Sequence, residues 1–451
     1  MSLLTSKPKG TADVLPGESE KIVFMENKLR ECAALYGFCE LRTPVFEHTE
    51  LFQRGVGETT DVVQKEMYTF EDNGRRSITL RPEGTAGTVR AFLEHGLFNE
   101  PLPQKYFYLT SCYRYEKPQA GRLREFHQFG VEALGAGSPA EDAEIISLAK
   151  HIFDLFGVEK LRLEINSIGC PVCRKSFQAA LRDYFTSYKD KLCETCLTRL
   201  EKNPMRILDC KSPVCGEIAK GAPRVLDYLC AECEDHFAQV KKYLTVMGID
   251  FTVNPTIVRG LDYYTKTVFE FVSDAIGAQG TVCGGGRYDG LVGELGGVPL
   301  PACGFGMGIE RLKLLLEAQE TEFPPPDRVQ LYLAPANAAY SFEAMRLCET
   351  LRSEGVSAQT DVAGRSLKAQ MKYANKLSAR FTLVLGEDEI STHLAKVKNM
   401  DTGEEKEVSL DRLAGDFLKI LLSAQLGDIP AADAEEIKLT LLNGGKNTWN
   451  V

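Results

Sequence analysis

The sequence predicts an α+β protein in which an antiparallel sheet forms the core, a cysteine-rich insert interrupts that core, and an α/β domain follows it. Residues 105–115 and 126–134 alternate apolar and polar side chains like two half-buried strands, and a polar stretch too long for a tight hairpin joins them. Eight cysteines lie between Cys170 and Cys233. Beyond the proline-rich segment 323–327, strand-like and helix-like segments alternate, as in a small domain with a mostly parallel sheet.

A chain of 451 residues is too long for one ordinary hydrophobic core, so we expect domains of about 100 to 200 residues each. Residues 1–168 and 251–322 are expected to form the two parts of the core, and residues 169–250 the insert. Residues 328–422 form the expected α/β domain, and residues 423–451 an extension.

The composition is that of a globular protein, because 44% of the residues are hydrophobic and 26% are charged. No apolar run reaches the roughly 18 residues that span a bilayer, and the first residues lack the apolar stretch of a secretory signal. We therefore expect a cytoplasmic protein without a membrane partner. A formal net charge of -10 argues against coating nucleic acid through bulk charge, although it leaves room for a local basic groove.

The core elements follow from periodicity. Residues 18–36 carry apolar side chains at helical spacing, and residues 37–48 form a short strand-like run that Pro44 breaks. Residues 268–272 and 281–286 are expected strands, and residues 304–318 a strand that ends in glycines and leads into an amphipathic helix.

Arginine recurs beside glycine and glutamate in these segments. Arg114, Glu116 and Arg122 lie in or beside the polar stretch between the first two strands, and Arg311 begins the helix after the glycines. A guanidinium group holds phosphate oxygens with two parallel hydrogen bonds and stays charged at physiological pH, so these arginines are candidate phosphate ligands. A solvated loop face is the alternative for any one of them.

Six segments, taken together, resemble the histidyl-tRNA synthetases of class II. The strand-loop-strand around Arg114 and the strand-helix around Arg311 resemble motifs 2 and 3 of class II aminoacyl-tRNA synthetases, and TPVFE at 43–47 resembles the weaker motif 1. RGLDYYTKTVFEF at 259–271 and GGGRYDGL at 284–291 resemble the two histidine signature peptides, and LRPEGTAGTVR at 80–90 resembles the amino-acid loop of the same family.

This resemblance implies a homodimeric class II enzyme that ligates L-histidine to tRNA(His) with ATP and Mg²⁺, through a histidyl-adenylate, releasing AMP and pyrophosphate. It implies catalytic roles for Arg259 and Arg114 at the reacting phosphate. The residues implied to bind ATP are Arg114, Glu116, Arg122 and Arg311, and those implied to bind histidine are Glu83, Gly84, Thr85, Gln128, Glu132, Tyr263 and Tyr264. His127, between them, is given no catalytic role. The C-terminal domain resembles the anticodon-binding domain that several class II enzymes share.

The cysteines of the insert permit structural zinc. In a chain without an export signal, clustered cysteines favour metal ligation or free thiols over disulfides. Cys170/Cys173 and Cys193/Cys196 have the spacing of a zinc ribbon and predict one site; Cys210, Cys215, Cys230 and Cys233 could form a second. Other pairings and metal-free thiols both remain open.

Two other functions would each account for part of the sequence. A paralogue that senses histidine without catalysis should have lost the phosphate-binding arginines or the C-terminal domain, and this chain keeps both. A zinc-ribbon nucleic-acid binder would account for the cysteines but leaves the first 170 or so residues unexplained.

Overall fold

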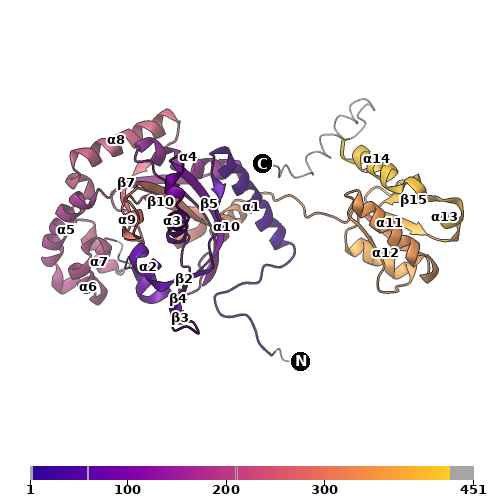
Figure 1. The fold of residues 1–451 in the computed structure, drawn as a ribbon, viewed down its shortest axis with the longest axis horizontal. Helices are drawn as coiled ribbons and strands as arrows, with labels where there is room; N and C mark the ends of the chain where they lie inside the picture. Colours follow the sequence, from indigo (N-terminus) through magenta and orange to yellow (C-terminus); the bar gives the residue numbers. More distant parts are fainter. Residues whose placement is uncertain (1–3, 58–59, 209, 211, 258, 427–451) are drawn as a thin grey trace. The chain divides into compact units, whose positions relative to one another are not determined.

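The computed structural model describes residues 4–57, 60–208, 210, 212–257 and 259–426. They form two compact units, which divide between Pro324 and Pro325 (Figure 1). The predicted C-terminal extension lies outside the described residues from residue 427 onward. The finer domain boundaries stay predictions. Within the described residues, no helix is both long and apolar enough to cross a bilayer.

The first unit is built on an eight-stranded sheet with the order β1-β5-β6-β11-β10-β9-β7-β8. Neighbouring strands are antiparallel except in the pairs β1–β5 and β7–β8. The predicted antiparallel core is therefore confirmed. The strands are β1 Cys39–Glu40, β5 Gln104–Tyr113, β6 Glu125–Leu134, β7 Leu161–Ser167, β8 Thr252–Val253, β9 Thr265–Ser273, β10 Thr281–Arg287 and β11 Ala302–Gly308.

Helices cover one face of this sheet. The helices α1 (Glu18–Leu35), α4 (Pro139–Leu155), α8 (Ala231–Val246) and α10 (Ile309–Ala318) share a buried cluster with Phe129, Phe269 and Phe305 of the sheet. The opposite face carries α3 (Thr85–Glu94) and α9 (Leu291–Glu294), whose buried residues join a second cluster. Because side chains alternate along a strand, the residues directly before and after each of these phenylalanines face away from the four helices.

A second, three-stranded sheet precedes the motif 2 strands. It has the order β2-β4-β3, with β2 Phe46–His48, β3 Tyr68–Glu71 and β4 Ser77–Leu80, and α2 (Thr49–Val56) follows β2. The hairpin of β3 and β4 was not predicted, although its turn contains the Asn73-Gly74 pair that favours tight hairpins.

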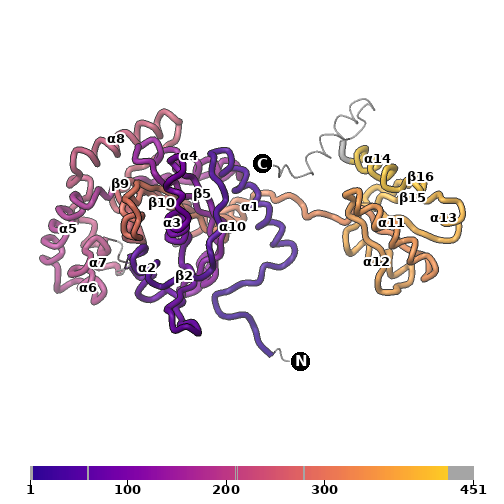
Figure 2. Tube along the Cα trace, in the orientation of Figure 1, coloured from indigo at the N-terminus to yellow at the C-terminus, as the bar shows by residue number. Residues whose placement is uncertain are grey.

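The insert consists of α5 (Pro171–Thr186), α6 (Glu194–Lys202) and α7 (Pro213–Ala219), and the chain returns to the core through α8. Figure 2 shows α5, α6 and α7 gathered in one lobe of the first unit.

The second unit has a five-stranded sheet with the order β13-β12-β14-β15-β16. Its strands are β12 Leu331–Pro335, β13 Ala358–Thr360, β14 Phe381–Leu385, β15 Leu394–Asn399 and β16 Glu405–Ser409, and its helices are α11 Ser341–Ser353, α12 Leu367–Lys376, α13 Glu387–Thr392 and α14 Leu413–Leu426. The prediction of a mostly parallel sheet is half right. β12, β13 and β14 are parallel, but β15 and β16 form an antiparallel hairpin, whose short connection cannot hold a crossover helix.

Candidate functional site

The floor of the candidate site is formed by β6 and β11, and β11 has glycine, which lacks a side chain, at every second position from Gly304 to Gly308. β6 pairs with β11 so that Gln128, Gly130 and Glu132 lie opposite Gly308, Gly306 and Gly304. A Cβ at Gly306 would lie 2.3 Å from the side-chain nitrogen of Gln128. The glycines therefore let the side chains of the neighbouring strand lie across the sheet, which explains the glycine-rich motif 3 segment.

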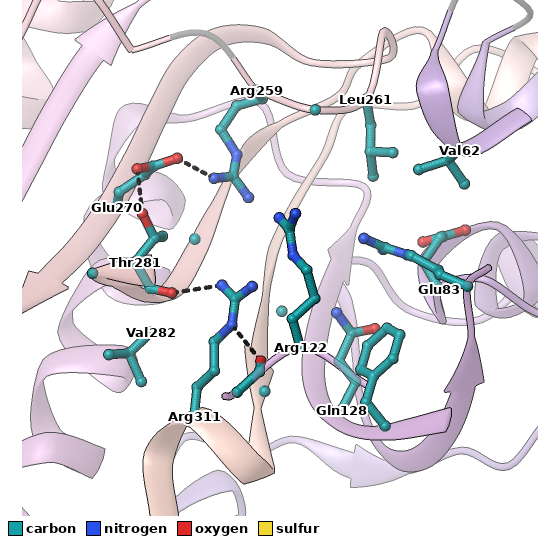
Figure 3. Close-up of a pocket in the computed structure, with 18 of the residues that line it drawn as sticks. Val62, Glu83, Arg122, Gln128, Arg259, Leu261, Glu270, Thr281, Val282 and Arg311 are labelled. Carbon is teal, nitrogen blue, oxygen red and sulfur yellow. Dashed lines mark hydrogen bonds and ion pairs between the residues drawn. The ribbon is translucent and has the colours of Figure 1, made fainter. Parts of the chain in front are cut away.

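A cavity of about 550 Å³ opens above this floor. It brings together most of the predicted site residues, and Figure 3 shows Glu83 and Gln128 across the cavity from Arg259 and Arg311. The predicted residues that line it are Glu83, Thr85, Arg114, Glu116, Arg122, Gln128, Arg259, Tyr263, Tyr264 and Arg311.

Arg259 and Arg311 are held by one chain of contacts. Arg259 pairs with Glu270 of β9, whose other oxygen accepts a hydrogen bond from the Thr281 hydroxyl at 2.9 Å. The Thr281 carbonyl accepts a hydrogen bond of 2.8 Å from Arg311. Arg311 also donates to the carbonyl of Gly121 at 3.1 Å, so that it ties the motif 2 loop to β10. Sequence reasoning missed both Glu270, although it lies within the first signature peptide, and Thr281, which lies in no motif.

Two further arginines face the same space from β5 and its loop. Arg114 donates to the Pro82 carbonyl at 2.8 Å, and its guanidinium lies 5.3 Å from the centre of the Phe126 ring. Arg122 pairs with Glu116 at 2.6 Å. Burial, followed by the charges of Arg122 and Arg114, lowers the pKa of Arg311. This part of the cavity therefore concentrates positive charge, and a bound anion would offset the repulsion between the arginines.

The other part of the cavity carries hydrogen-bond acceptors. Glu83 accepts main-chain N–H bonds from Thr85 at 2.7 Å and Ala86 at 2.9 Å, at the start of α3. Burial raises the pKa of Glu83. Tyr263 and Tyr264 are both buried, with ring centres 4.7 Å apart, and Arg259 lies 5.5 Å from the Tyr264 ring.

Glu132 is not among the residues that line the cavity; it lies behind the wall. Its carboxylate accepts hydrogen bonds from Thr85 at 2.6 Å, from Tyr108 at 3.0 Å and from Tyr288. Burial raises the pKa of Glu132 to about 8. Sequence reasoning missed both tyrosines, although Tyr288 falls within the second signature peptide.

Gly84, which is predicted to bind histidine, is likewise not among the residues that line the cavity. A Cβ there would lie 2.3 Å from the ring of Tyr108, so Gly84 makes room for the tyrosine that reaches Glu132. His127 pairs with Glu310 of α10 at 2.8 Å, and this hydrogen bond raises the pKa of His127. The carboxylate of Glu310 also accepts the main-chain N–H of His127. Glu310 lines the cavity and was missed as well.

The insert groups its cysteines differently from the zinc-ribbon prediction. Four sulfur atoms lie within 4.8 Å of one another in each of two clusters: Cys170, Cys173, Cys230 and Cys233 form cluster A, and Cys193, Cys196, Cys210 and Cys215 form cluster B. The predicted pairing of Cys170/Cys173 with Cys193/Cys196 is therefore wrong. Sequence spacing favoured cysteine pairs that are neighbours along the chain. In the fold, the start of α8 lies beside the start of α5, so Cys230 and Cys233 meet Cys170 and Cys173.

Comparisons with known proteins agree with this geometry. The family model described as histidyl-tRNA synthetase matches residues 10–183 and 197–312, and the anticodon binding domain model matches residues 330–420. A histidine--tRNA ligase from Caldanaerobacter subterraneus subsp. tengcongensis is 54% identical over 411 residues, which are 91% of this chain and 99% of that protein.

Solved structures show the same likeness. The apo histidyl-tRNA synthetase of S. aureus matches with a TM-score of 0.79 and 40% identity, over 92% of this chain and 100% of that one. A protein of Bacillus halodurans, described as an ATP phosphoribosyltransferase regulatory subunit/histidyl-tRNA synthetase, matches with a TM-score of 0.60 over 83% of this chain and 97% of that one. Its identity of 23% makes that likeness one of fold alone. The family model, the 54% identical relative and the arginine-lined cavity together show that the chain belongs to the histidyl-tRNA synthetase family.

Proposed function

We propose that the protein ligates L-histidine to tRNA(His) through a histidyl-adenylate, with release of AMP and pyrophosphate. That it is a histidine--tRNA ligase follows from its family. One observation supports the finer mechanism: a single cavity is lined by four arginines and also by Glu83, Gln128 and Tyr264. A site for a polyphosphate next to an ammonium group and a ring needs both kinds of side chain.

In the first step, a carboxylate oxygen of histidine attacks the α-phosphorus of ATP. The new bond joins histidine to AMP, the bond to the β-phosphate breaks, and pyrophosphate leaves. The carboxylate is ionised at neutral pH, so no general base is required. Catalysis then consists of positioning and of stabilising charge at the α-phosphate, the role proposed for Arg259 and Arg114, with Arg122 and Arg311 at the outer phosphates.

Histidine is proposed to bind with its ammonium group at Glu83, Thr85 and Gln128. Tyr264 and Tyr263 would flank its ring. We assign Glu132 an indirect role, because it already accepts hydrogen bonds from three hydroxyl groups and orients Thr85. A site that hydrogen-bonds the substrate ring rejects analogues without those groups by about 10⁴-fold or more, so no editing step is needed.

Mg²⁺ fits this cavity, because Glu116 and Glu310 contribute carboxylate oxygens, the ligands it prefers, to the same lining as the arginines. When bound, it would neutralise phosphate charge alongside the arginines. In the second step, a hydroxyl of the terminal ribose of tRNA(His) attacks the histidyl carbonyl, and AMP leaves. The unit that matches the anticodon-binding model is the proposed contact for the anticodon.

A homodimer is also proposed, through the β2-β4-β3 sheet. Phe46 pairs with Leu80 and Phe70 with Ile78, two residues along the same strand, so both phenylalanines face the same side. Phe46 is 56% exposed and Phe70 is 48% exposed in the single chain. Exposed apolar side chains on one face suit an interface with a second copy.

Pyrophosphate exchange into ATP tests the mechanism. Exchange should depend on histidine, and Arg259→His should reduce it by about 10² to 10³, the worth of one lost donor to the reacting centre. Arg162→His is the matched control, because Arg162 pairs with Asp274 at the surface and should not matter. Exchange that is independent of histidine, or equal loss in both variants, would refute the assignment.

A further inference from the structure

Clusters A and B lie outside the cavity and have no part in the chemistry proposed above. Each contains two pairs of cysteines from separate stretches of chain. In each pair, the first cysteine is partly buried and the second is buried. Four thiols that converge from two pairs are the donor set of a tetrahedral metal site.

The sulfur separations agree with one metal ion in each cluster. Sγ of Cys170 lies 3.6 Å from that of Cys173 and 4.0 Å from that of Cys230, and Sγ of Cys193 lies 3.9 Å from that of Cys210. A zinc–sulfur bond of about 2.3 Å gives a tetrahedron with edges of about 3.8 Å. A disulfide would need about 2.05 Å. A four-iron cluster binds each cysteine to a different iron and so spreads the sulfurs wider.

The main chain around the sulfurs suits thiolates. The N–H of Cys230 donates to Sγ of Cys173 at 3.1 Å, that of Cys193 to Sγ of Cys215 at 3.3 Å, and that of Ser212 to Sγ of Cys210 at 3.5 Å. Such N–H···S hydrogen bonds orient metal ligands and offset their negative charge.

Three of the four pairs also begin a helix of nine residues or more. Cys170, Cys193 and Cys230 precede the first residues of α5, α6 and α8, and Cys173, Cys196 and Cys233 lie in the first turns. The positive end of each helix dipole therefore lies beside two sulfurs. Together with the sulfur separations, this arrangement favours thiolates held around a cation over neutral thiols.

We infer that the insert binds two Zn²⁺ ions, one in each cluster, and that each ion replaces the four thiol protons of its cluster. The two ions have different structural tasks. Cluster A joins Cys170 and Cys173, where the chain leaves the core after β7, to Cys230 and Cys233, where α8 brings it back. Cluster B closes the part of the insert between these crossings. A lobe of this size has little core of its own and gains stability from such links.

Metal analysis of the full chain, purified without chelator, tests this inference. We expect two equivalents of zinc in the native protein, one in Cys173→Ala, one in Cys196→Ala and none in the double variant. Cys32→Ala is the matched control, because Cys32 is equally buried but lies in α1, and it should keep both ions. Less than about half an equivalent, or iron in place of zinc, would overturn the inference.

A second measurement avoids variants that fail to fold. A mercurial reagent added to the native protein should release two zinc ions as the eight thiols of clusters A and B react, beyond the exposed Cys39, and a dye that binds zinc would record them. Protein in which Co²⁺ replaces zinc should show the strong visible absorption of a tetrahedral thiolate site, reduced by about half in each single variant that folds. Eight thiols that react fully without metal release would overturn both sites. These readouts do not depend on histidine or ATP, so they remain informative if the proposed mechanism fails.

Discussion

Two adjacent glycines of β10 should separate catalysis from stability when each is replaced by alanine. A Cβ at Gly284 would lie 2.5 Å from Nη1 and 2.7 Å from Nη2 of Arg259. A Cβ at Gly285 points to the other face and would lie 2.2 Å from the carbonyl oxygen of Gly304 and 2.6 Å from Cβ of Phe305. The first clash is with the end of a flexible side chain and the second is with the paired strand.

The expected losses of rate and of stability depend on which group can move to relieve each clash. Arg259 can yield in Gly284→Ala, but its guanidinium must shift by about 1 Å, and a misplacement of that size costs about 10²-fold in rate. This loss corresponds to about 3 kcal/mol of transition-state stabilisation. Folding should change by less than about 1 kcal/mol. In Gly285→Ala, β10 and β11 must separate, and overpacking of this kind destabilises by about 1 to 3 kcal/mol or more.

Histidine-dependent pyrophosphate exchange and urea unfolding measure the two effects. Gly284→Ala should lose kcat while it keeps its urea midpoint, and Gly285→Ala should lower the midpoint. Gly290→Ala is the control, because the nearest atom to its added Cβ is a Glu294 oxygen at 3.4 Å. A kcat of Gly284→Ala within about threefold of the native value, or an equal loss of stability in both variants, would refute this prediction.

Three further predictions concern pH, a buried ion pair and assembly. Because burial raises the pKa of Glu132 from 4.5 to about 8, the native state retains a proton that the unfolded chain releases in this range. The free energy of unfolding should therefore fall as pH rises from about 5 to about 8, and urea titrations of Glu132→Gln should show a flatter profile. Asp142→Ala leaves the fully buried Arg287 with Asp289, a partly exposed residue, as its carboxylate partner and should cost about 3 kcal/mol in urea unfolding; a loss below about 1 kcal/mol would contradict this. Phe46→Lys combined with Phe70→Lys should convert a dimer to monomers in sedimentation, and an unchanged mass would exclude this face as the interface.

Much of the first unit could be predicted because its signals are local. Apolar spacing along residues 18–36 predicted α1, and alternation predicted β5 and β6 to within two residues at each end. The arginines of the cavity were found because their motifs lie in a recognisable order. For these elements, whose patterns depend on neighbours along the chain, prediction and structure agree.

Contacts between distant residues could not be predicted in this way. Asp142 accepts hydrogen bonds from His236, 94 residues away, and from Arg287, 145 residues away. Because these residues become neighbours only when α4, α8 and β10 pack together, their separation in the sequence predicts no contact. The same reason explains the incorrect cysteine pairing, since Cys170 and Cys230 become neighbours only when α8 returns beside α5. The motif around Glu132 predicts that it binds histidine. Its position behind the cavity wall depends on its hydrogen bonds with Tyr108 and Tyr288, which lie far from it in the sequence.

The segment that supplies Arg259 and the two pocket tyrosines is also the place where core and insert are joined. Lys266, two residues beyond Tyr264, has a φ of 48°, in the left-handed region that lysine seldom adopts, and lies at an irregularity in the pairing of β9 with β10. Its main-chain N–H donates to Gly169, its carbonyl accepts from Ile168, and its ammonium group pairs with Glu232 of α8. Contacts from both crossings of the insert therefore hold this strained residue. Cluster A lies at the same two crossings, so any change that loosens them acts on the backbone that positions Tyr264, although no cysteine of the cluster lines the cavity.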